Sequence, residues 1–218
     1  MSEDGRVWMG TANGLAALSL DGTWQTWVGG KPGLPHRSAT DLHPITDLSL
    51  DPTGRYLWIA TDGGGASRYD IPADHWHRLS TLGSDLPDDA VRVVVASHEN
   101  TVWLGTPAGL SGVERLWETY SFYVPRISDR LPCSRVLAGW TNPETGTIWV
   151  GTETLSDIIS VTGCGVSRSD DGGQTWQTFS TADGLGDNDI RAVWGNGAGV
   201  VWVGTNGGVS RSADGGAT

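Results

Sequence analysis

Short segments with alternating apolar and polar positions run through the whole chain, separated by glycine-rich and proline-rich turns. The clearest is Val-Trp-Val-Gly-Thr at the C-terminal end. Five copies of this pattern are present, at residues 7–11, 57–61, 102–106, 148–152 and 201–205. The copies follow one another at intervals of 45 to 53 residues. A period of this size indicates one supersecondary unit that is repeated and stacked.

Each repeat contains the patterns of four strands. The last one predicts a first strand at residues 189–194, a second at 200–204 and a third that begins at 209. A fourth strand is predicted at residues 175–179, one repeat earlier. Its counterparts are residues 23–27, 75–79 and 116–120. Alternation with β-branched and aromatic residues is typical of strands, and sustained helical spacing is not found, so we expect almost no helix. Four antiparallel strands repeated around an axis form a blade of a β-propeller, which makes the predicted class all-β.

Most tryptophans fall at two positions of the repeat, in the second and the fourth strand. The second-strand residues are Trp8, Trp58, Trp103, Trp149 and Trp202, and the fourth-strand residues are Trp24, Trp76, Trp117 and Trp176. Stacking platforms for sugars are the alternative, but repetition at fixed phases favours burial between neighbouring sheets, where indoles contribute most apolar area.

The whole chain, residues 1–218, is predicted to be a single propeller domain of about five repeats. Their approximate limits are 1–44, 45–89, 90–132, 133–187 and 188–218. The first repeat has no first strand and the last has no fourth, so the chain is interpreted as an incomplete, out-of-phase segment of a longer propeller. An open arc whose edges pair with another chain is also consistent with the pattern. A closed four-blade ring is a third arrangement, in which the strand at 189–194 completes the first blade.

Composition excludes several functions. The formal net charge is −11 and no basic patch is found, so we expect no nucleic-acid partner. No apolar run is long enough for a transmembrane helix, and the first residues do not resemble a signal peptide. Cys133 and Cys164 form no ligand-like motif; they are either a disulfide or two separate buried thiols, and their spacing favours thiols.

Two turns share a further pattern. Residues 169–176, Ser-Asp-Asp-Gly-Gly-Gln-Thr-Trp, fit Ser-x-Asp-x-Gly-x-Thr-Trp, and residues 212–218 fit it until the chain stops one residue short of the expected Trp. The pattern resembles the Asp-box (BNR-like) hairpin of sialidases and related propellers. Asp171 and Asp214 are therefore expected to bind backbone groups of their own turns, away from the ligand face. Carboxylates are too few here for calcium, and no metal or cofactor is predicted.

The combined repeat resembles the two-component-regulator propeller. It contains Trp-x-Gly-Thr-x-x-Gly-(Leu/Val)-Ser-Arg, a fourth-strand Trp and a connector of the Asp-Gly-Leu-Pro type. The connectors are residues 33–35, 85–87, 130–132 and 183–185. The resemblance implies a periplasmic or extracellular sensor domain of bacterial hybrid histidine kinases, often associated with polysaccharide breakdown. The chain itself contains no kinase pattern.

Candidate ligand-binding residues gather where hairpins between second and third strands meet the connectors. The long hairpin at 153–163 contains Glu153 and Asp157, and the connector at 29–44 contains His36 and Arg37. Three arginines are predicted to occupy the same position of the repeat, near the start of the innermost strand: Arg92, Arg135 and Arg191. Guanidinium groups that converge there bind a carboxylate or sulfate, unless each pairs with a local carboxylate such as Asp89 or Asp189. Variation in loop length without a function is the other interpretation of the long loops.

These features predict a non-catalytic sensor module that binds a soluble small molecule, an oligosaccharide or a protein partner. An Asp-box glycoside hydrolase and a structural scaffold are the alternatives. No pair of catalytic residues is recognised, and His75 with His77 has no third ligand for a metal. No membrane insertion is expected, whereas self-association through open blade edges is.

Overall fold

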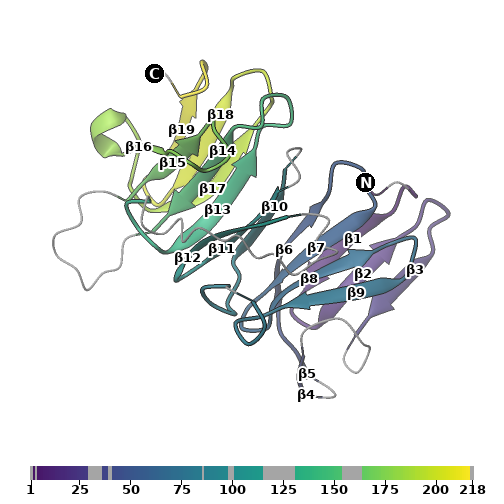
Figure 1. Ribbon diagram of the computed structural model, residues 1–218. Coiled ribbons are helices and arrows are strands. Elements are labelled where there is room, and N and C mark those ends of the chain that lie inside the picture. The colour runs from purple at the N-terminus through teal and green to yellow at the C-terminus, as the bar shows by residue number, and fades with distance from the viewer. Residues whose placement is uncertain are drawn as a thin grey trace.

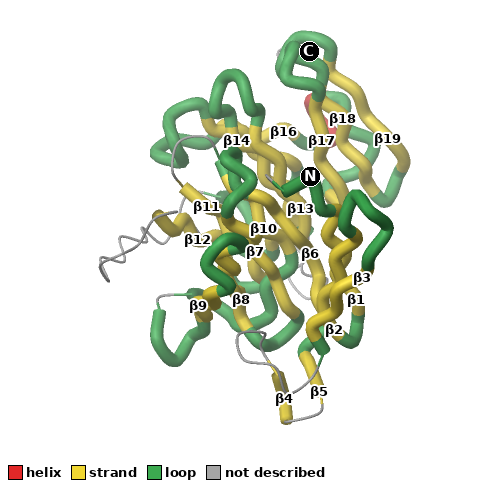
Figure 2. The backbone as a smooth tube through the Cα atoms, turned by 90° about the vertical axis from the view of Figure 1, so that its right-hand side faces the viewer, coloured by secondary structure: helices red, strands yellow, loops and turns green. Residues whose placement is uncertain are grey.

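The computed structural model describes residues 2, 4–28, 36–38, 41–84, 86–97, 101–114, 131–153 and 164–216. Within them the chain forms antiparallel sheets that follow one another in an arc (Figure 1). Strands and turns make up nearly all of the backbone, and the described helical structure is the short 3-10 turn η2 (Thr181–Asp183) (Figure 2). The predicted all-β propeller architecture is confirmed.

Five sheets correspond to the five repeats. Sheet 1 contains β1 (Val7–Thr11), β2 (Gly14–Leu18) and β3 (Trp24–Trp27). Sheet 2 contains β6 (Ile45–Leu50), β7 (Tyr56–Thr61), β8 (Gly65–Asp70) and β9 (His75–Leu79). Sheet 3 contains β10 (Val93–Ala96), β11 (Thr101–Thr106) and β12 (Gly109–Glu114). Sheet 4 contains β13 (Val136–Thr141), β14 (Ile148–Thr152), β15 (Val166–Ser169) and β16 (Gln177–Phe179). Sheet 5 contains β17 (Ile190–Gly195), β18 (Val201–Thr205) and β19 (Gly208–Ser212). A separate hairpin pairs β4 (His36–Ser38) with β5 (Asp41–Leu42).

The strand order in every sheet follows the chain, and all neighbouring strands are antiparallel. The five Trp-containing segments are the equivalent strands β1, β7, β11, β14 and β18, as predicted. Three predicted fourth strands are found as β3, β9 and β16, whereas residues 116–120 lie outside the described part. Because β17 pairs with β18 in sheet 5, the closed ring in which this strand completes the first blade is wrong.

The glycine of the Trp-x-Gly-Thr segment lets neighbouring sheets approach closely. A Cβ atom on Gly10 would lie 2.3 Å from the Ile45 side chain of the next sheet. Gly105 meets Val136 at 2.4 Å and Gly151 meets Ile190 at 2.4 Å in the same way. Sheets 1, 3 and 4 therefore each receive a branched side chain from the start of the following sheet.

Side-chain bonds also join the innermost strands of sheets 2 and 3. Asp47 accepts a hydrogen bond from the Val94 N–H at 2.9 Å, and the Ser49 hydroxyl accepts one from Ala96 N–H at 3.0 Å. Burial raises the pKa of the Asp47 carboxyl. These bonds satisfy backbone groups of an inner strand that has no neighbouring strand on that side.

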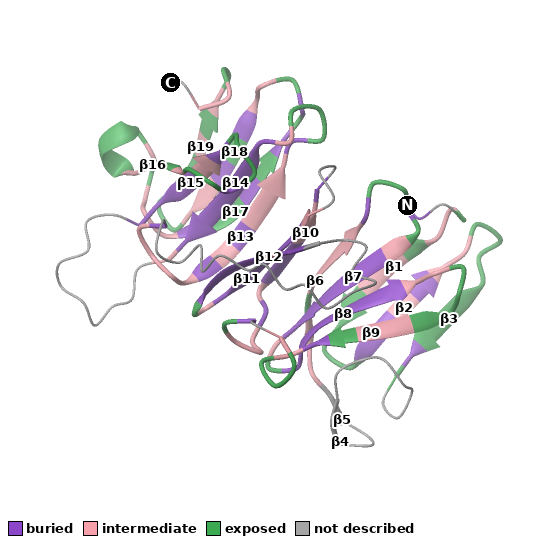
Figure 3. Cartoon of the chain, in the orientation of Figure 1, coloured by how far each residue is buried: buried purple, intermediate pink, exposed green. Residues whose placement is uncertain are grey.

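Burial of the repeat tryptophans depends on their place in the arc. Trp58, Trp103 and Trp149 are buried, whereas Trp202 in the last sheet is 42% exposed and Trp24 in the first sheet is 56% exposed. Exposed residues mark both ends of the arc in Figure 3. The expected burial does not hold for these two side chains, because among the described residues no further sheet covers either end.

Candidate functional site

One end of the sheets, here called the loop face, collects the hairpins after second strands and the connectors between sheets. Three hairpin N–H groups donate to connector carbonyls: Gly63 to Asp89 at 3.0 Å, Glu153 to Arg135 at 3.0 Å, and Asn206 to Asp189 at 3.1 Å. The prediction that hairpins and connectors share one face is confirmed.

Polar residues directly after the second-strand threonine meet arginines on this face. Asp62, Glu153 and Asn206 occupy this equivalent position. The ion pairs are Arg92 Nη1 with Asp62 Oδ2 at 3.2 Å, Arg135 Nε with Glu153 Oε2 at 2.9 Å, and Arg191 Nη2 with Glu153 Oε1 at 2.7 Å. The predicted residues Arg135, Arg191 and Glu153 thus lie together, whereas Arg92 belongs to a separate ion pair.

The strand registers correct the phase of the arginines. Ile190 and Val136 both face the threonine that ends the second strand, Thr205 and Thr152. Arg191 is the residue after Ile190, whereas Arg135 is the residue before Val136. Both strands have a β-bulge directly after this apolar residue. Arg191 occupies the bulge position, whereas Arg135 lies two residues earlier in the repeat, and the sequence pattern does not reveal this difference. Arg135 consequently contacts Glu153 within its own sheet, and Arg191 reaches it from the next sheet.

The Arg135–Glu153–Arg191 cluster has a formal charge of +1. Its carboxylate is mostly buried, with a side chain 16% exposed, while the Arg135 and Arg191 side chains are 38% and 45% exposed. Arg191 Nε also donates to Asn206 Oδ1 at 2.8 Å, and Asn206 Nδ2 donates to Asp189 Oδ2 at 3.3 Å. Arg135 Nε lies beside Glu153 without the alignment of a hydrogen bond.

This arrangement holds two guanidinium groups in place around one carboxylate. Each guanidinium has five N–H donors, and only some of them are directed at Glu153 or Asn206. The others remain accessible because both arginine side chains are partly exposed. Such a surface can bind carboxylate, sulfate or hydroxyl oxygens in a fixed geometry.

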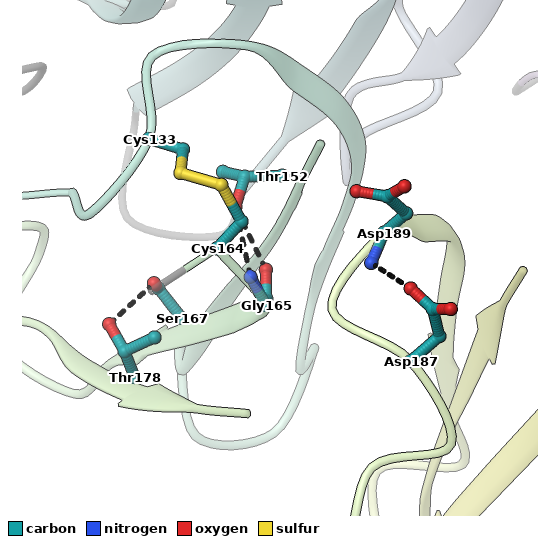
Figure 4. The surroundings of a disulfide bond; sticks show 8 residues. All are labelled: Cys133, Thr152, Cys164, Gly165, Ser167, Thr178, Asp187 and Asp189. Carbon is teal, nitrogen blue, oxygen red and sulfur yellow. Dashed lines mark hydrogen bonds between the residues drawn. A yellow bond between two sulfur atoms is a disulfide. The ribbon is translucent and has the colours of Figure 1, made fainter. Parts of the chain in front are cut away.

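A disulfide joins Cys133 to Cys164, close to Thr152 and Gly165 (Figure 4). The expectation of two separate thiols is therefore wrong. Cys133 precedes β13 and Cys164 precedes β15, and both strands begin at the loop face. Thr152, at the end of β14, bonds Gly165 through its backbone N–H at 3.0 Å and through its hydroxyl at 3.0 Å. This pairing brings the two cysteine Cα atoms to 5.4 Å, which sequence spacing alone does not indicate.

The first Asp-box forms the turn between β15 and β16, at the opposite end of the sheet from the loop face. Asp171 Oδ1 accepts hydrogen bonds from the Ser169 hydroxyl at 2.9 Å and the Thr175 N–H at 2.8 Å. Gly173 has φ +84°, and its missing side chain leaves room for Trp103 of the preceding sheet. The carboxylate closes its own turn, as expected from the sequence.

Asp171 is expected to titrate with a pKa of about 2, chiefly because the Thr175 hydroxyl donates to its carboxylate. An unfolded Asp titrates near 3.9, so the turn gains its full stabilisation above about pH 4 and loses it as the pH falls through about 2. Thr175→Val should raise this pKa, which carboxyl-detected NMR can follow. An unchanged value would show that the hydroxyl is not the main cause.

Some sequence-predicted residues are not placed by the structure. Asp157 lies outside the described residues, and so do the side chains of His36 and Arg37, although both belong to β4. His75 Nδ1 and His77 Nε2 are 3.0 Å apart, and burial lowers the pKa of His77. Among the described residues, no group of three or more His, Cys, Asp or Glu side chains is arranged for a metal ion.

Two contributors to the loop face, Asp62 and Asn206, were missed by the sequence analysis. Their signal is positional, because each directly follows the Trp-x-(Gly/Ala)-Thr segment as Glu153 does. An alignment of the five repeats at this position would identify all three.

Comparison with known proteins establishes the fold. No protein-family model and no curated protein matches the sequence. The structure is similar to the extracellular domains of two hybrid two-component systems of B. thetaiotaomicron, with TM-scores of 0.72 and 0.70 at 19% and 18% identity. These matches cover 97% and 96% of this chain but 27% and 28% of those domains.

A virginiamycin B lyase of Staphylococcus aureus is also similar, with a TM-score of 0.60 at 14% identity over 97% of this chain and 67% of that enzyme. The β-propeller architecture that the repeats predict is thus the one observed here. In the described part, no helix is long and apolar enough to cross a membrane.

Proposed function

We propose that the chain is a non-catalytic ligand-binding module of an extracytoplasmic sensor, and that its loop face binds an anionic, carbohydrate-like molecule. The observation that carries the proposal is the Arg135–Glu153–Arg191 cluster. Glu153 fixes both guanidinium groups before a ligand arrives, which reduces the entropy lost on binding.

Two observations support an extracytoplasmic sensor. The similar propellers include extracellular domains of hybrid two-component systems. The Cys133–Cys164 disulfide also suits an oxidising compartment, because disulfides persist in the periplasm and outside the cell. We therefore place the module in the periplasm or at the cell surface, coupled to a histidine kinase.

The proposed ligand class follows from the two guanidinium groups of the cluster. Their partly exposed side chains offer N–H donors that suit a carboxylate, while nearby Asn206 and Asp189 offer partners for hydroxyl groups. Uronic-acid oligosaccharides combine both groups. The Asp-box enzyme alternative is less favoured, because the Asp171 carboxylate is engaged in its own turn on the other face.

Arg135→Ala is expected to weaken binding of an acidic oligosaccharide by about 1.5–3 kcal/mol, the range for a hydrogen bond to a charged group. Binding to the unchanged protein should also weaken with salt, because exposed charges are screened over about 10 Å at 0.1 M ionic strength. Isothermal titration calorimetry at several salt concentrations measures both effects.

Arg55→Ala is the matched control. Arg55 pairs with Asp70 at 2.9 Å, at the opposite end of β7 from the loop face. Its loss should leave binding unchanged. If the Arg135→Ala variant and the unchanged protein bind the oligosaccharide with equal affinity, the proposed anion site is wrong. If neither binds any small ligand, the scaffold alternative is favoured.

A further inference from the structure

Arg92 and Arg191 occupy the same position of the repeat. Each is the residue before the one that faces the glycine of the Trp-x-Gly-Thr segment. Each also reaches back to the carboxylate that follows the second-strand threonine of the preceding sheet. Arg92 pairs in this way with Asp62 at 3.2 Å, and Arg191 with Glu153 at 2.7 Å. The Arg92–Asp62 pair between sheets 2 and 3 is therefore the counterpart of the Arg191–Glu153 pair between sheets 4 and 5.

The two other boundaries between sheets have uncharged residues at the same positions. These are Ala12 and Thr46 between sheets 1 and 2, and Pro107 and Leu137 between sheets 3 and 4. Charged and uncharged boundaries thus alternate along the described loop face. The boundary between the two charged pairs is apolar.

The hairpin that carries Asp62 is held from both sides. Asp62 N–H donates to the Pro44 carbonyl at 2.9 Å, and the His43 ring nitrogen Nδ1 lies 3.0 Å from the Asp62 carbonyl oxygen. On the other side, Gly63 N–H donates to the Asp89 carbonyl at 3.0 Å. The backbone beside the carboxylate is therefore fixed before any ligand binds, which lowers the entropic cost of binding.

The chemistry of the Arg92–Asp62 pair differs from that of the Arg135–Glu153–Arg191 cluster. One guanidinium faces one carboxylate, whereas the cluster places two guanidinium groups around one carboxylate. The side chains of Arg92 and Asp62 are 33% and 41% exposed, so N–H donors and carboxylate oxygens are accessible side by side. Neighbouring hydroxyl groups of a sugar can accept from the first and donate to the second. The pair therefore suits a polar, uncharged part of a ligand.

We propose that Arg92 and Asp62 form a second sugar subsite of the loop face, which binds a further unit of the oligosaccharide held by the cluster. This inference rests on the proposed function. Stacked sheets lie about 10 Å apart, so the two pairs are up to about 20 Å from each other. A monosaccharide cannot span this separation, whereas an oligosaccharide can, with its C–H faces over Pro107 and Leu137. Affinity should consequently depend on the length of the oligosaccharide, because the second contact becomes intramolecular.

The test is isothermal titration calorimetry with oligogalacturonates of increasing length. The affinity of the unchanged protein should rise by about tenfold or more once the oligosaccharide bridges both subsites. Arg92→Ala and Asp62→Ala should each remove this rise, so that they weaken binding of long oligosaccharides far more than binding of short ones. Arg135→Ala should weaken binding at every length. Arg55→Ala is the control, because it removes an ion-paired arginine at the opposite end of β7, and it should leave the rise intact.

The results that contradict the second subsite differ from those that contradict the proposed function. The same rise with length in the Arg92→Ala variant would overturn the second subsite alone, provided that Arg135→Ala still weakens binding. Equal weakening of short and long oligosaccharides by Arg92→Ala would also overturn it, since it would show a purely structural role. If no oligogalacturonate binds the unchanged protein, both proposals are wrong.

Discussion

Trp103→Ala and Trp149→Ala are each expected to lower the free energy of unfolding by about 3–5 kcal/mol, the usual cost of deleting a buried aromatic side chain. Both indoles are nearly inaccessible, with 5% and 3% of their surface exposed. Each lies between two sheets and touches an Asp-box glycine of the following sheet, Gly173 or Gly216. Urea denaturation of the single variants measures the loss.

Trp194→Ala, in strand β17, serves as the control. Its side chain is 58% exposed, so its loss should cost less than about 1 kcal/mol. Trp140 is only partly buried and packs against Gly195. The loss of unfolding free energy in Trp140→Ala should therefore lie between these values. Equal losses at all four positions would contradict the assignment of second-strand tryptophans as the contacts between sheets.

Removal of the disulfide should have the second largest effect. The double variant with Cys133→Ser and Cys164→Ser is expected to lose about 2–5 kcal/mol, because a cross-link between residues 31 apart restricts the unfolded chain. The bond also holds the segment that contains Arg135 at the loop face. Its removal should therefore lower the affinity for the ligand as well as the stability. Thermal and denaturant melts of the variant give the magnitude.

A reducing agent provides the control for that experiment. It should lower the midpoint of the unchanged protein toward that of the double variant and leave the variant itself unaffected. Identical midpoints for the oxidised protein and the variant would mean that the disulfide adds nothing to stability.

The sequence was informative wherever a residue acts within its own repeat. The Trp-x-(Gly/Ala)-Thr segments predicted equivalent strands, and the glycines of three copies, Gly10, Gly105 and Gly151, serve the same close approach to the next sheet. The Asp-box of Asp171 was also predicted correctly, since its hydrogen bonds lie within one turn. Interactions between residues close in the sequence can be predicted from the local sequence pattern.

Features that depend on register or on neighbouring sheets could not be predicted in the same way. Arg135 precedes Val136 whereas Arg191 follows the equivalent Ile190, so the two arginines lie two residues apart in the repeat, and a single sequence does not reveal this strand register. The pairing of Cys133 with Cys164 depends on the order of three strands. The exposure of Trp24 and Trp202 depends on which sheets cover the ends of the arc.

Hydrogen exchange with and without an acidic oligosaccharide, such as an oligogalacturonate, tests the central claim most directly, because it locates a ligand as well as detecting it. The proposed loop-face site predicts new protection at low salt around four residues: Arg135, Glu153, Arg191 and Asn206. Arg135→Ala should reduce this protection, and the oligosaccharide should be recovered intact. Protection at the Asp-box turns together with cleaved oligosaccharide, or no change in exchange anywhere, would contradict it.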